Sequence, residues 1–158
     1  MTREILLRFI VSSFITNISK LEIDVEDKLI ELGYDMGKRL LLVSSVDFTS
    51  DCDGLLYFIT YEYLSLISNT NRQIEKIVTD NSIKYLLIEE EPFWSQFIKF
   101  NKKDDLNDYI CIDAITGGII KSVLMAKGYE SKVVSHNVIE DNKRKVIHQI
   151  IIDKFIKL

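Results

Sequence analysis

The N-terminal part of the chain carries three apolar patterns at helical spacing. Residues 5–18 are apolar on most faces of a helix, so a central buried helix and a helix covered in part by another chain both stay open. Asp24 can cap a second helix, whose apolar stripe is Val25, Leu29, Leu32, Met36 and Leu40. We expect a third helix to start near Ser50 or Asp51 and to bury the stripe Leu55, Leu56, Ile59, Tyr63, Leu66 and Ile67.

Two strands are expected next. Residues 83–90 and 93–100 are apolar and rich in strand formers, and Pro92 fits only at their junction because proline cannot donate within a ladder. Residues 73–82 satisfy neither the helical nor the strand period for long enough, so a short helix and a loop both stay open for them.

The C-terminal part predicts a helix and a hairpin. Residues 109–127 have apolar positions at helical spacing, and Gly128 is placed to end that helix. Residues 132–138 and 144–155 alternate as strands around a polar turn. Because the order is three helices, two strands, a helix and two strands, we expect an α+β fold with a largely antiparallel sheet and helices on one face. The length predicts one domain over residues 1–158.

Composition narrows the function classes. The net charge of −4 comes from interspersed acids and bases, so no basic face favours nucleic acid as a partner. No uninterrupted apolar run is long enough for a membrane span, and we expect a soluble, cytoplasmic protein. The two cysteines, Cys52 and Cys111, lie far apart, which supports neither a disulfide framework nor a zinc ribbon.

Three successive acids, Glu89, Glu90 and Glu91, are the densest candidate chemistry. Carboxylates can ligate a hard cation, but consecutive strand residues point to opposite faces, so we expect a solvated or partner-facing acidic corner instead. His136 and His148 fall in the two arms of the hairpin and could be cross-strand neighbours, yet two histidines alone make a poor zinc site.

No nucleophile frame or phosphate-binding loop is recognisable in the sequence. We therefore expect no catalytic residue, no metal and no cofactor.

Two of the predicted helices each contain a pair of glycines. Gly33 and Gly37 stand four residues apart, which removes side chains from one face and lets another backbone approach. Gly117 and Gly118 lie inside the helix predicted at residues 109–127, where close packing is again the expected reason.

Three motifs resemble one family closely. They are LGYDMGKRL at residues 32–40, YLLIEEEP at 85–92 and TGGIIKSVLMAKGYESKVVSH at 116–136. Together they resemble the small subunits of the transport protein particle (TRAPP), a vesicle-tethering complex, and best the subunit-five type. The residues matching the family's structural motifs are Gly33, Gly37, Arg39, Pro92, Gly118 and Gly128. The sequence departs from the family pattern at Ile115, Lys121, Glu130 and Asn137.

The resemblance implies a non-catalytic scaffold subunit that supports ER-to-Golgi transport. Its partners would be other TRAPP small subunits and, through the assembled complex, a Rab-type GTPase whose nucleotide exchange the complex promotes. Contact with ER and cis-Golgi membranes would be peripheral. The interface candidates are Leu7, Val11 and Phe14 of the first helix and Glu89, Glu90 and Glu91 of the acidic turn.

Two alternatives stay open. The lipid-carrying subunit of the same family bears an acyl chain on a cysteine at the start of its third helix, and Cys52 falls near that place. Asp51 precedes it where that subunit has an arginine, and the charge of Asp51 opposes thiolate formation. A small-ligand sensor of the four-vinyl-reductase type has a similar fold and would need His136 or His148 as a polar anchor.

Overall fold

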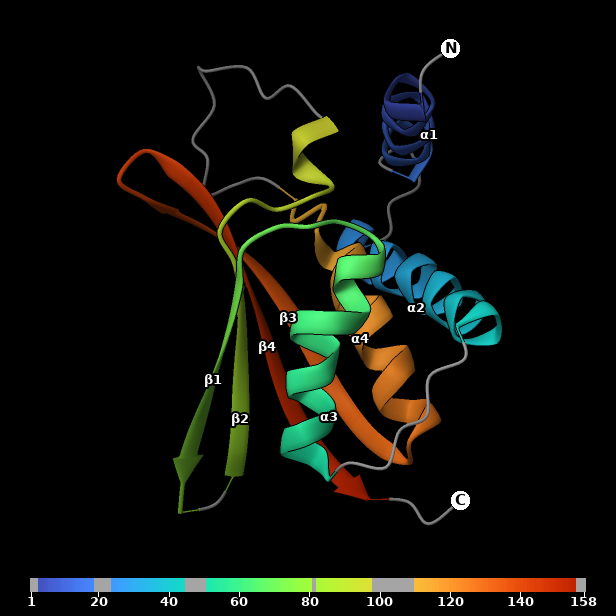
Figure 1. Cartoon of the computed structure of the whole chain (residues 1–158). Coiled ribbons are helices and arrows are strands. Elements are labelled where there is room, and N and C mark those ends of the chain that lie inside the picture. Colours follow the sequence, from blue (N-terminus) through green and yellow to red (C-terminus); the bar gives the residue numbers. More distant parts are fainter. Residues whose placement is uncertain (1–2, 19–23, 45–50, 81, 98–109, 156–158) are drawn as a thin grey trace.

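The computed structural model describes residues 3–18, 24–44, 51–80, 82–97 and 110–155. One sheet of four strands forms a layer, and helices cover one of its faces (Figure 1). The helices are α1 (Arg3–Ile18), α2 (Val25–Val43), α3 (Cys52–Phe58) and α4 (Ala114–Ala126). The strands are β1 (Arg72–Thr79), β2 (Ser82–Glu89), β3 (Tyr129–Glu140) and β4 (Lys143–Phe155). The predicted α+β class, its element order and its antiparallel sheet are confirmed.

The sheet has the order β1-β2-β4-β3, and every neighbouring pair is antiparallel. The β3–β4 hairpin turns at Asp141 and Asn142, whose φ angles are 51° and 59°. Positive φ at both central residues is typical of a type I′ turn, which Asn and Asp tolerate better than most side chains. The predicted hairpin is therefore confirmed at this position.

The first hairpin lies earlier in the chain than predicted. Residues 72–79 form β1 and cover most of the segment 73–82, for which a helix and a loop both stayed open. The strand predicted at residues 93–100 is wrong over residues 93–97, and residues 98–100 lie outside the described part of the chain. In its place, a short 3₁₀ turn, η3 (Ser95–Phe97), puts Phe93 edge-on against Trp94 and Phe97, with ring centroids 5.0 and 5.1 Å away. These aromatic side chains pack into a corner instead of alternating across a sheet.

The third helix also differs from the prediction. The α-helical part ends at Phe58 and continues as a π-helical turn, η1 (Ile59–Tyr63), and a 3₁₀ turn, η2 (Leu64–Leu66). This change of winding shifts the buried positions, so Leu64 is buried while Leu66 is exposed. The last predicted helix is shorter than expected, because α4 begins at Ala114; Gly128, with φ 85°, follows its end as predicted.

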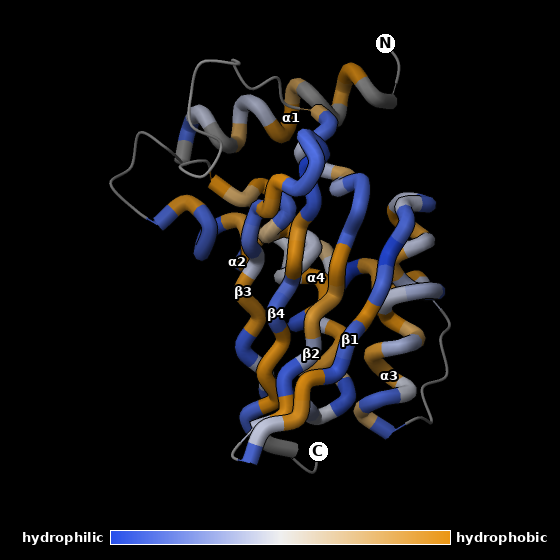
Figure 2. The backbone as a smooth tube through the Cα atoms, turned by 90° about the vertical axis from the view of Figure 1, so that its left-hand side faces the viewer, coloured by the Kyte–Doolittle hydropathy of each residue, from blue (hydrophilic) through white to orange (hydrophobic). Residues whose placement is uncertain are grey.

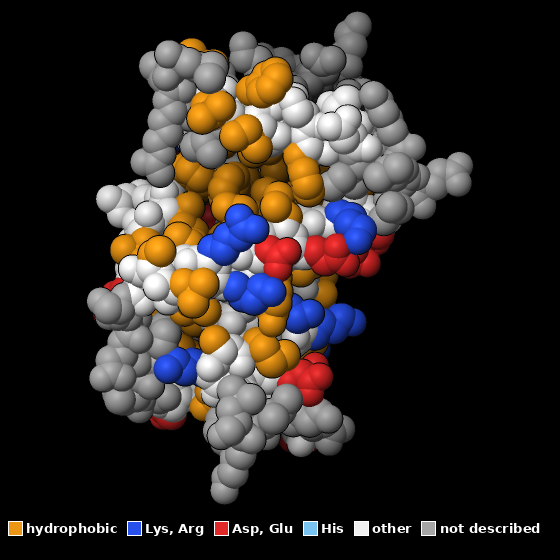
Figure 3. All heavy atoms as spheres, turned by 90° about the vertical axis from the view of Figure 1, so that its right-hand side faces the viewer, with side chains coloured by type: hydrophobic (Ala, Val, Ile, Leu, Met, Phe, Trp, Pro, Cys, Tyr) orange, Lys and Arg blue, Asp and Glu red, His pale blue; other side chains and the backbone are white. Residues whose placement is uncertain are grey.

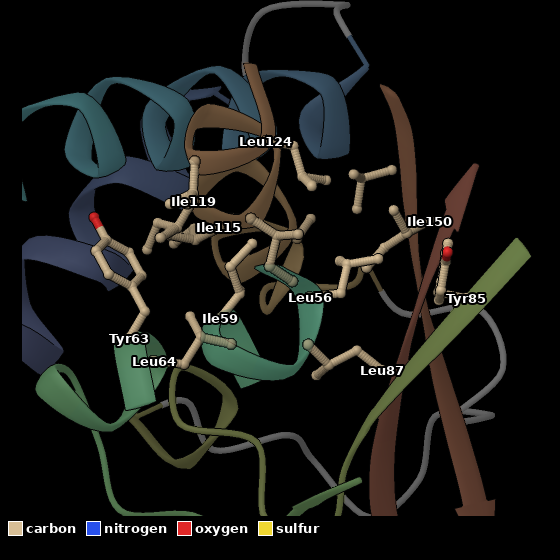
Figure 4. Packing of buried hydrophobic residues seen from close by; sticks show 14 of the residues in the cluster. Leu56, Ile59, Tyr63, Leu64, Tyr85, Leu87, Ile115, Ile119, Leu124 and Ile150 are labelled. Carbon is tan, nitrogen blue, oxygen red and sulfur yellow. The ribbon is translucent and has the colours of Figure 1, made fainter. Parts of the chain in front are cut away.

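The core lies between the sheet and the helices, with α4 at its centre. Every residue from position 111 to 120 is buried, because α2 covers one side of α4 and the sheet covers the other. Figure 4 shows Ile115 and Ile119 of α4 next to Ile59 of the segment that comprises α3, η1 and η2 (the α3 segment), with Leu56 between them and the sheet side chains Leu87 and Ile150. No described helix combines the length and apolarity that a membrane span requires.

Three glycines let α2 and α4 cross in close contact. A Cβ atom on Gly33 would overlap the backbone carbonyl of Ile115, and one on Gly118 would overlap the carbonyl of Ile30. A Cβ atom on Gly37 would meet the Ser122 side chain. Backbone therefore lies against backbone at this crossing, which a larger residue at Gly33 or Gly118 would force apart.

Candidate functional site

Helix α1 presents an apolar surface to solvent. Ile5, Leu6, Phe9 and Ile10 are all exposed, and the Phe9 side chain retains 69% of its accessible area. In Figure 3, apolar side chains gather in the upper part of the molecule, where α1 lies. Contiguous exposed apolar side chains on a helix are typical of a surface that another protein covers.

The three predicted interface residues of α1 have different surroundings. Val11 is 5% exposed and belongs to the core, so the prediction that it is available to a partner is wrong. Phe14 is half-buried and packs against the same core, and the side chain of Leu7 lies outside the described part of the structure. Val11 and Phe14 attach α1 to the body, while Ile5, Leu6, Phe9 and Ile10 stay accessible.

The three glutamates of the acidic turn also differ in their exposure. Glu91 is exposed and Glu90 is half-buried, with a carboxylate oxygen 3.3 Å from Lys145 Nζ on β4. Glu89 is completely buried, which makes its assignment to a solvated or partner-facing corner wrong. The physical reason is strand alternation: Tyr85, Leu87 and Glu89 share the face of β2 that the helices cover. This period-two signal was present in the sequence.

Glu89, the last residue of β2, lies in a buried polar cluster on the face of the sheet that the helices cover. Its Oε1 is 3.5 Å from Arg72 Nε on β1 and 3.5 Å from His148 Nε2 on β4. The other imidazole nitrogen, Nδ1, is 2.8 Å from the Ser135 hydroxyl on β3. Arg72 is held from its far side, donating to the Ser68 carbonyl and hydroxyl at 2.9 and 2.7 Å. All four strands thus contribute one side chain to this cluster.

The cluster is ionic more than hydrogen-bonded. Neither carboxylate oxygen of Glu89 has a hydrogen-bond partner among the described residues, and the same holds for Arg72 Nε and His148 Nε2. Burial alone would raise the pKa of Glu89, but His148 and then Arg72 outweigh it and hold that pKa below its ordinary value. Glu89 is therefore a buried carboxylate that its neighbours His148 and Arg72 keep ionised.

Asp113 joins the aromatic segment after Pro92 to the start of α4. Its carboxylate accepts from the Trp94 and Ser95 backbone N–H groups at 2.8 and 3.1 Å and from the Ser95 hydroxyl. Complete burial, and after it the charge of Glu89, raises the pKa of Asp113 to about 6. Asp113 was not identified from the sequence, because a lone aspartate before a helix usually indicates only a cap.

The pH dependence of stability provides a test of this raised pKa. A carboxyl group with a folded-state pKa of about 6 and an ordinary value of 3.8 contributes stability that is present at low pH and lost as the pH rises through 6. Between pH 5 and 7 this should cost the wild type about 1 kcal/mol. Asp113→Asn should remove that slope in urea unfolding, while the exposed Asp35→Asn should keep it. Equal slopes in Asp113→Asn and wild type would contradict the assignment.

The two histidines are not cross-strand neighbours. His136 pairs with Ile147 and is exposed, whereas His148 pairs with Ser135 and is buried. They lie on opposite faces of the sheet, so they cannot share a ligand. In the part of the chain that the structure describes, three or more His, Cys, Asp or Glu side chains with metal-binding geometry do not come together.

Cys52 is the first residue of α3 and is half-buried. Burial raises the pKa of its thiol, with Asp53 and Asp51 adding to that effect and Tyr85 and Lys76 opposing it. A raised pKa leaves little thiolate at neutral pH, which disfavours nucleophilic or acyl-transfer chemistry. Cys111 is buried beside Asp113, and burial raises its pKa as well.

The remaining residues of the family motifs lie in helices or turns, outside the polar cluster around Glu89. Pro92 is buried at the end of β2, directly before the aromatic corner. Arg39 is exposed on α2. Gly33, Gly37 and Gly118 form the α2–α4 crossing described above, and Gly128 ends α4.

Comparisons with known proteins point to one family. Residues 4–153 match the family described as transport protein particle (TRAPP) component. A putative trafficking protein particle complex subunit TRS31 from Encephalitozoon cuniculi is 32% identical over 145 residues, which are 91% of this chain and 97% of that protein.

Two longer relatives share a subunit name. Proteins named trafficking protein particle complex subunit 5 are 30% identical over 127 residues in Dictyostelium discoideum and 29% over 119 residues in Gallus gallus. The matches cover 77% and 72% of this chain but only 66% and 61% of those proteins.

The fold also has a solved counterpart. The crystal structure of a trafficking protein particle complex subunit 3 from Naegleria fowleri, covalently bound to palmitic acid, superposes with a TM-score of 0.73. The superposition covers 98% of both chains at 14% sequence identity. At that identity the likeness concerns the fold alone.

Proposed function

Because the chain belongs to the family of TRAPP components, we propose that it is a non-catalytic scaffold subunit of the subunit-five type, which joins sibling small subunits in the assembled complex. The resemblance found in the sequence motifs is confirmed at the level of the family. The observation that carries the scaffold role is the exposed apolar surface of α1, formed by Ile5, Leu6, Phe9 and Ile10. A stable subunit interface buries such side chains and often exceeds about 2,000 Å² in obligate assemblies.

The geometry of the buried polar groups supports a role without catalysis. Glu89, His148 and Arg72 lie in the core, where a substrate would have no access to them. The charges of Arg72 and Glu89 compensate one another across β1 and β2, which is a structural arrangement. We accordingly assign the function to surfaces.

Affinity purification tests the scaffold role. The tagged chain, expressed at its natural level in its own cells, should recover other TRAPP components identified by mass spectrometry. A reciprocal purification through one of those components should recover this chain. Recovery of no TRAPP component in either direction would overturn the proposal.

A substitution on α1 should weaken this assembly selectively. Phe9→Asp places a charge on an exposed side chain, so the isolated chain should keep its melting temperature within about 2 °C. Binding to a sibling subunit that covers α1 should fall by about 30-fold or more, as for an interface hot spot. Asn17→Asp, exposed on the same helix, is the matched control and should bind normally. Undiminished binding by Phe9→Asp would show that α1 is not the interface.

The finer role is a proposal about the assembled complex. We place this subunit in ER-to-Golgi transport, peripheral to the membranes, where it supports nucleotide exchange on a Rab-type GTPase through assembly alone. Exchange on a fluorescent-nucleotide-loaded Rab should be accelerated by the complex and not by the isolated subunit. Acceleration by the isolated subunit would contradict the scaffold role.

The two alternatives lead to different measurements. A lipid-carrying subunit acylated at Cys52 would show an added fatty acyl mass in the intact protein, whereas we expect the unmodified mass because burial and Asp53 suppress the thiolate. A small-ligand sensor would retain a chromophore, which an absorbance scan of the purified protein would detect.

A further inference from the structure

Strand β1 is an edge of the sheet, and its register fixes which of its main-chain groups face outward. Two residues connect Thr79 to Ser82, so this pair closes a two-residue hairpin and exchanges hydrogen bonds. At the other end of the strand, the Glu90 N–H donates to the Asn71 carbonyl at 3.0 Å, which gives the same alternation. The main-chain groups of Ile74, Lys76 and Val78 consequently point away from β2.

Within the described residues, these outward groups form an unprotected edge. None of the described residues donates to or accepts from the outward main-chain groups of Ile74, Lys76 and Val78. The β1–β2 register runs unbroken over eight pairs, whereas the other edge strand, β3, has a bulge between Glu130 and Ser131. Bulges are one way in which proteins discourage pairing at an edge, and β1 has none.

Two exposed tyrosines, Tyr57 and Tyr61, form an aromatic shelf beside this edge. Asp53 of α3 binds Lys76 of β1 at 2.7 Å, and Tyr61 lines a surface hollow together with Arg72 at the start of β1. The α3 segment therefore runs alongside β1, and Tyr57 lies between these two points. Figure 2 shows β1 as the outermost strand with α3 beside it. Tyr57 and Tyr61 are exposed, and their ring centroids are 4.7 Å apart.

We propose that the β1 edge and the Tyr57–Tyr61 shelf bind an extended segment of another TRAPP component, which adds a strand to the sheet. This inference rests on the proposed scaffold function and defines a second surface, distinct from α1. Main-chain hydrogen bonds to Ile74, Lys76 and Val78 supply the affinity in this mode of recognition, and side-chain positions supply the specificity.

The side chains around the edge define the chemistry of that segment. Its residues on the helix side would lie under the Tyr57–Tyr61 shelf, where large apolar side chains fit. On the open face, Glu75 favours a basic residue opposite it, and exposed Ile77 favours an apolar one. The segment is thus amphipathic with the period of a strand.

A second copy of this chain fits the edge less well. Antiparallel pairing of two β1 strands about their middle places Glu75 against Glu75 or Lys76 against Lys76, depending on the register. Like charges directly opposite one another are destabilising. We therefore assign the edge to a different polypeptide.

Proline at an outward position tests the proposal with little damage to the hairpin. Val78→Pro removes one outward N–H and leaves the bonds to β2 intact, while Val78→Thr keeps the N–H. Tyr57→Lys alters the shelf without touching the strand. In affinity purifications, Val78→Pro and Tyr57→Lys should each recover one TRAPP component at least ten-fold less than wild type, and the partner bound through α1 should remain. Val78→Thr should recover all components.

Amide hydrogen exchange provides the second readout. In the purified complex, the amides of Ile74, Lys76 and Val78 should exchange at least ten-fold more slowly than in the isolated chain, whereas those of Gln73, Glu75 and Ile77 are protected in both. Full recovery of all components by both variants together with unchanged exchange would overturn the edge proposal and leave the scaffold function standing. Recovery of no component by wild type would overturn the scaffold function. A wild-type dimer that Val78→Pro dissociates would overturn the choice of occupant.

Discussion

Gly33→Ala is expected to destabilise the protein by about 2–4 kcal/mol, although alanine is the better helix former by about 1 kcal/mol. The new methyl group would overlap the carbonyl oxygen of Ile115 and approach the carbonyl carbon and Cα of the same residue. All three are backbone atoms of a buried helix, so they cannot rotate away. The helices α2 and α4 would have to separate along their whole contact.

Urea unfolding of Gly33→Ala measures this cost against two controls. Lys38→Ala, exposed on the same helix, should change the free energy of unfolding by no more than about 0.5 kcal/mol. Gly37→Ala should cost less than Gly33→Ala, because its closest obstacle is the Ser122 hydroxyl, a side-chain atom. A raised unfolding midpoint for Gly33→Ala would show that the crossing has room to spare.

Glu89→Gln should cost a comparable amount, about 3 kcal/mol at pH 7. The amide keeps the shape of the side chain but removes the negative charge that faces Arg72 and His148 in the core. The guanidinium of Arg72 would then be buried without an anion, and a buried unpaired charge is among the most destabilising changes known. Glu90→Gln, one residue later and half-buried, should cost less than about 1 kcal/mol.

The acid limb of the unfolding curve gives an independent measurement. Because the pKa of Glu89 is lowered in the folded state, its contribution is present above its ordinary value of 4.5 and is lost as the pH falls through the folded-state value. Wild type should therefore lose stability on acidification below pH 4.5 more steeply than Glu89→Gln. Parallel acid limbs would contradict a lowered pKa for Glu89 in the native state.

Local patterns predicted the helices and the β3–β4 hairpin because the residues that specify a cap or a turn are neighbours in the sequence. The Asp24 cap accepts from Glu26 N–H at 3.0 Å, and the turn at Asp141 and Asn142 has the φ angles its residue types allow. Strand β1 escaped prediction because it is an edge. Most of its residues are exposed, so burial imposes no alternation on the sequence. The aromatic run after Pro92 was wrongly predicted as a strand. There, packing around Trp94 buries residues at irregular spacing, so burial does not indicate a strand.

The buried cluster around Glu89 could not be predicted from the acidic turn alone. Strand alternation assigns Glu89 to the inner face, but its partners Arg72 and His148 lie on other strands, and only the sheet order brings them together. A sequence in which β2 pairs with both β1 and β4 could not be distinguished by pattern from one with another order. The apolar excess of the first helix was predicted from the sequence, but the exposed residues Ile5, Leu6, Phe9 and Ile10 are not the interface residues named there, because the anchoring role of Val11 required the packing itself.

The exposed face of α1 also bears on how much of this protein a cell maintains. A chain made in excess of its partners presents Ile5, Leu6, Phe9 and Ile10 to water. Chaperones and proteases recognise such surfaces, and unassembled copies are removed faster than assembled ones. The abundance of this chain should then follow the supply of its partner, so that synthesis of the partner sets the number of complexes.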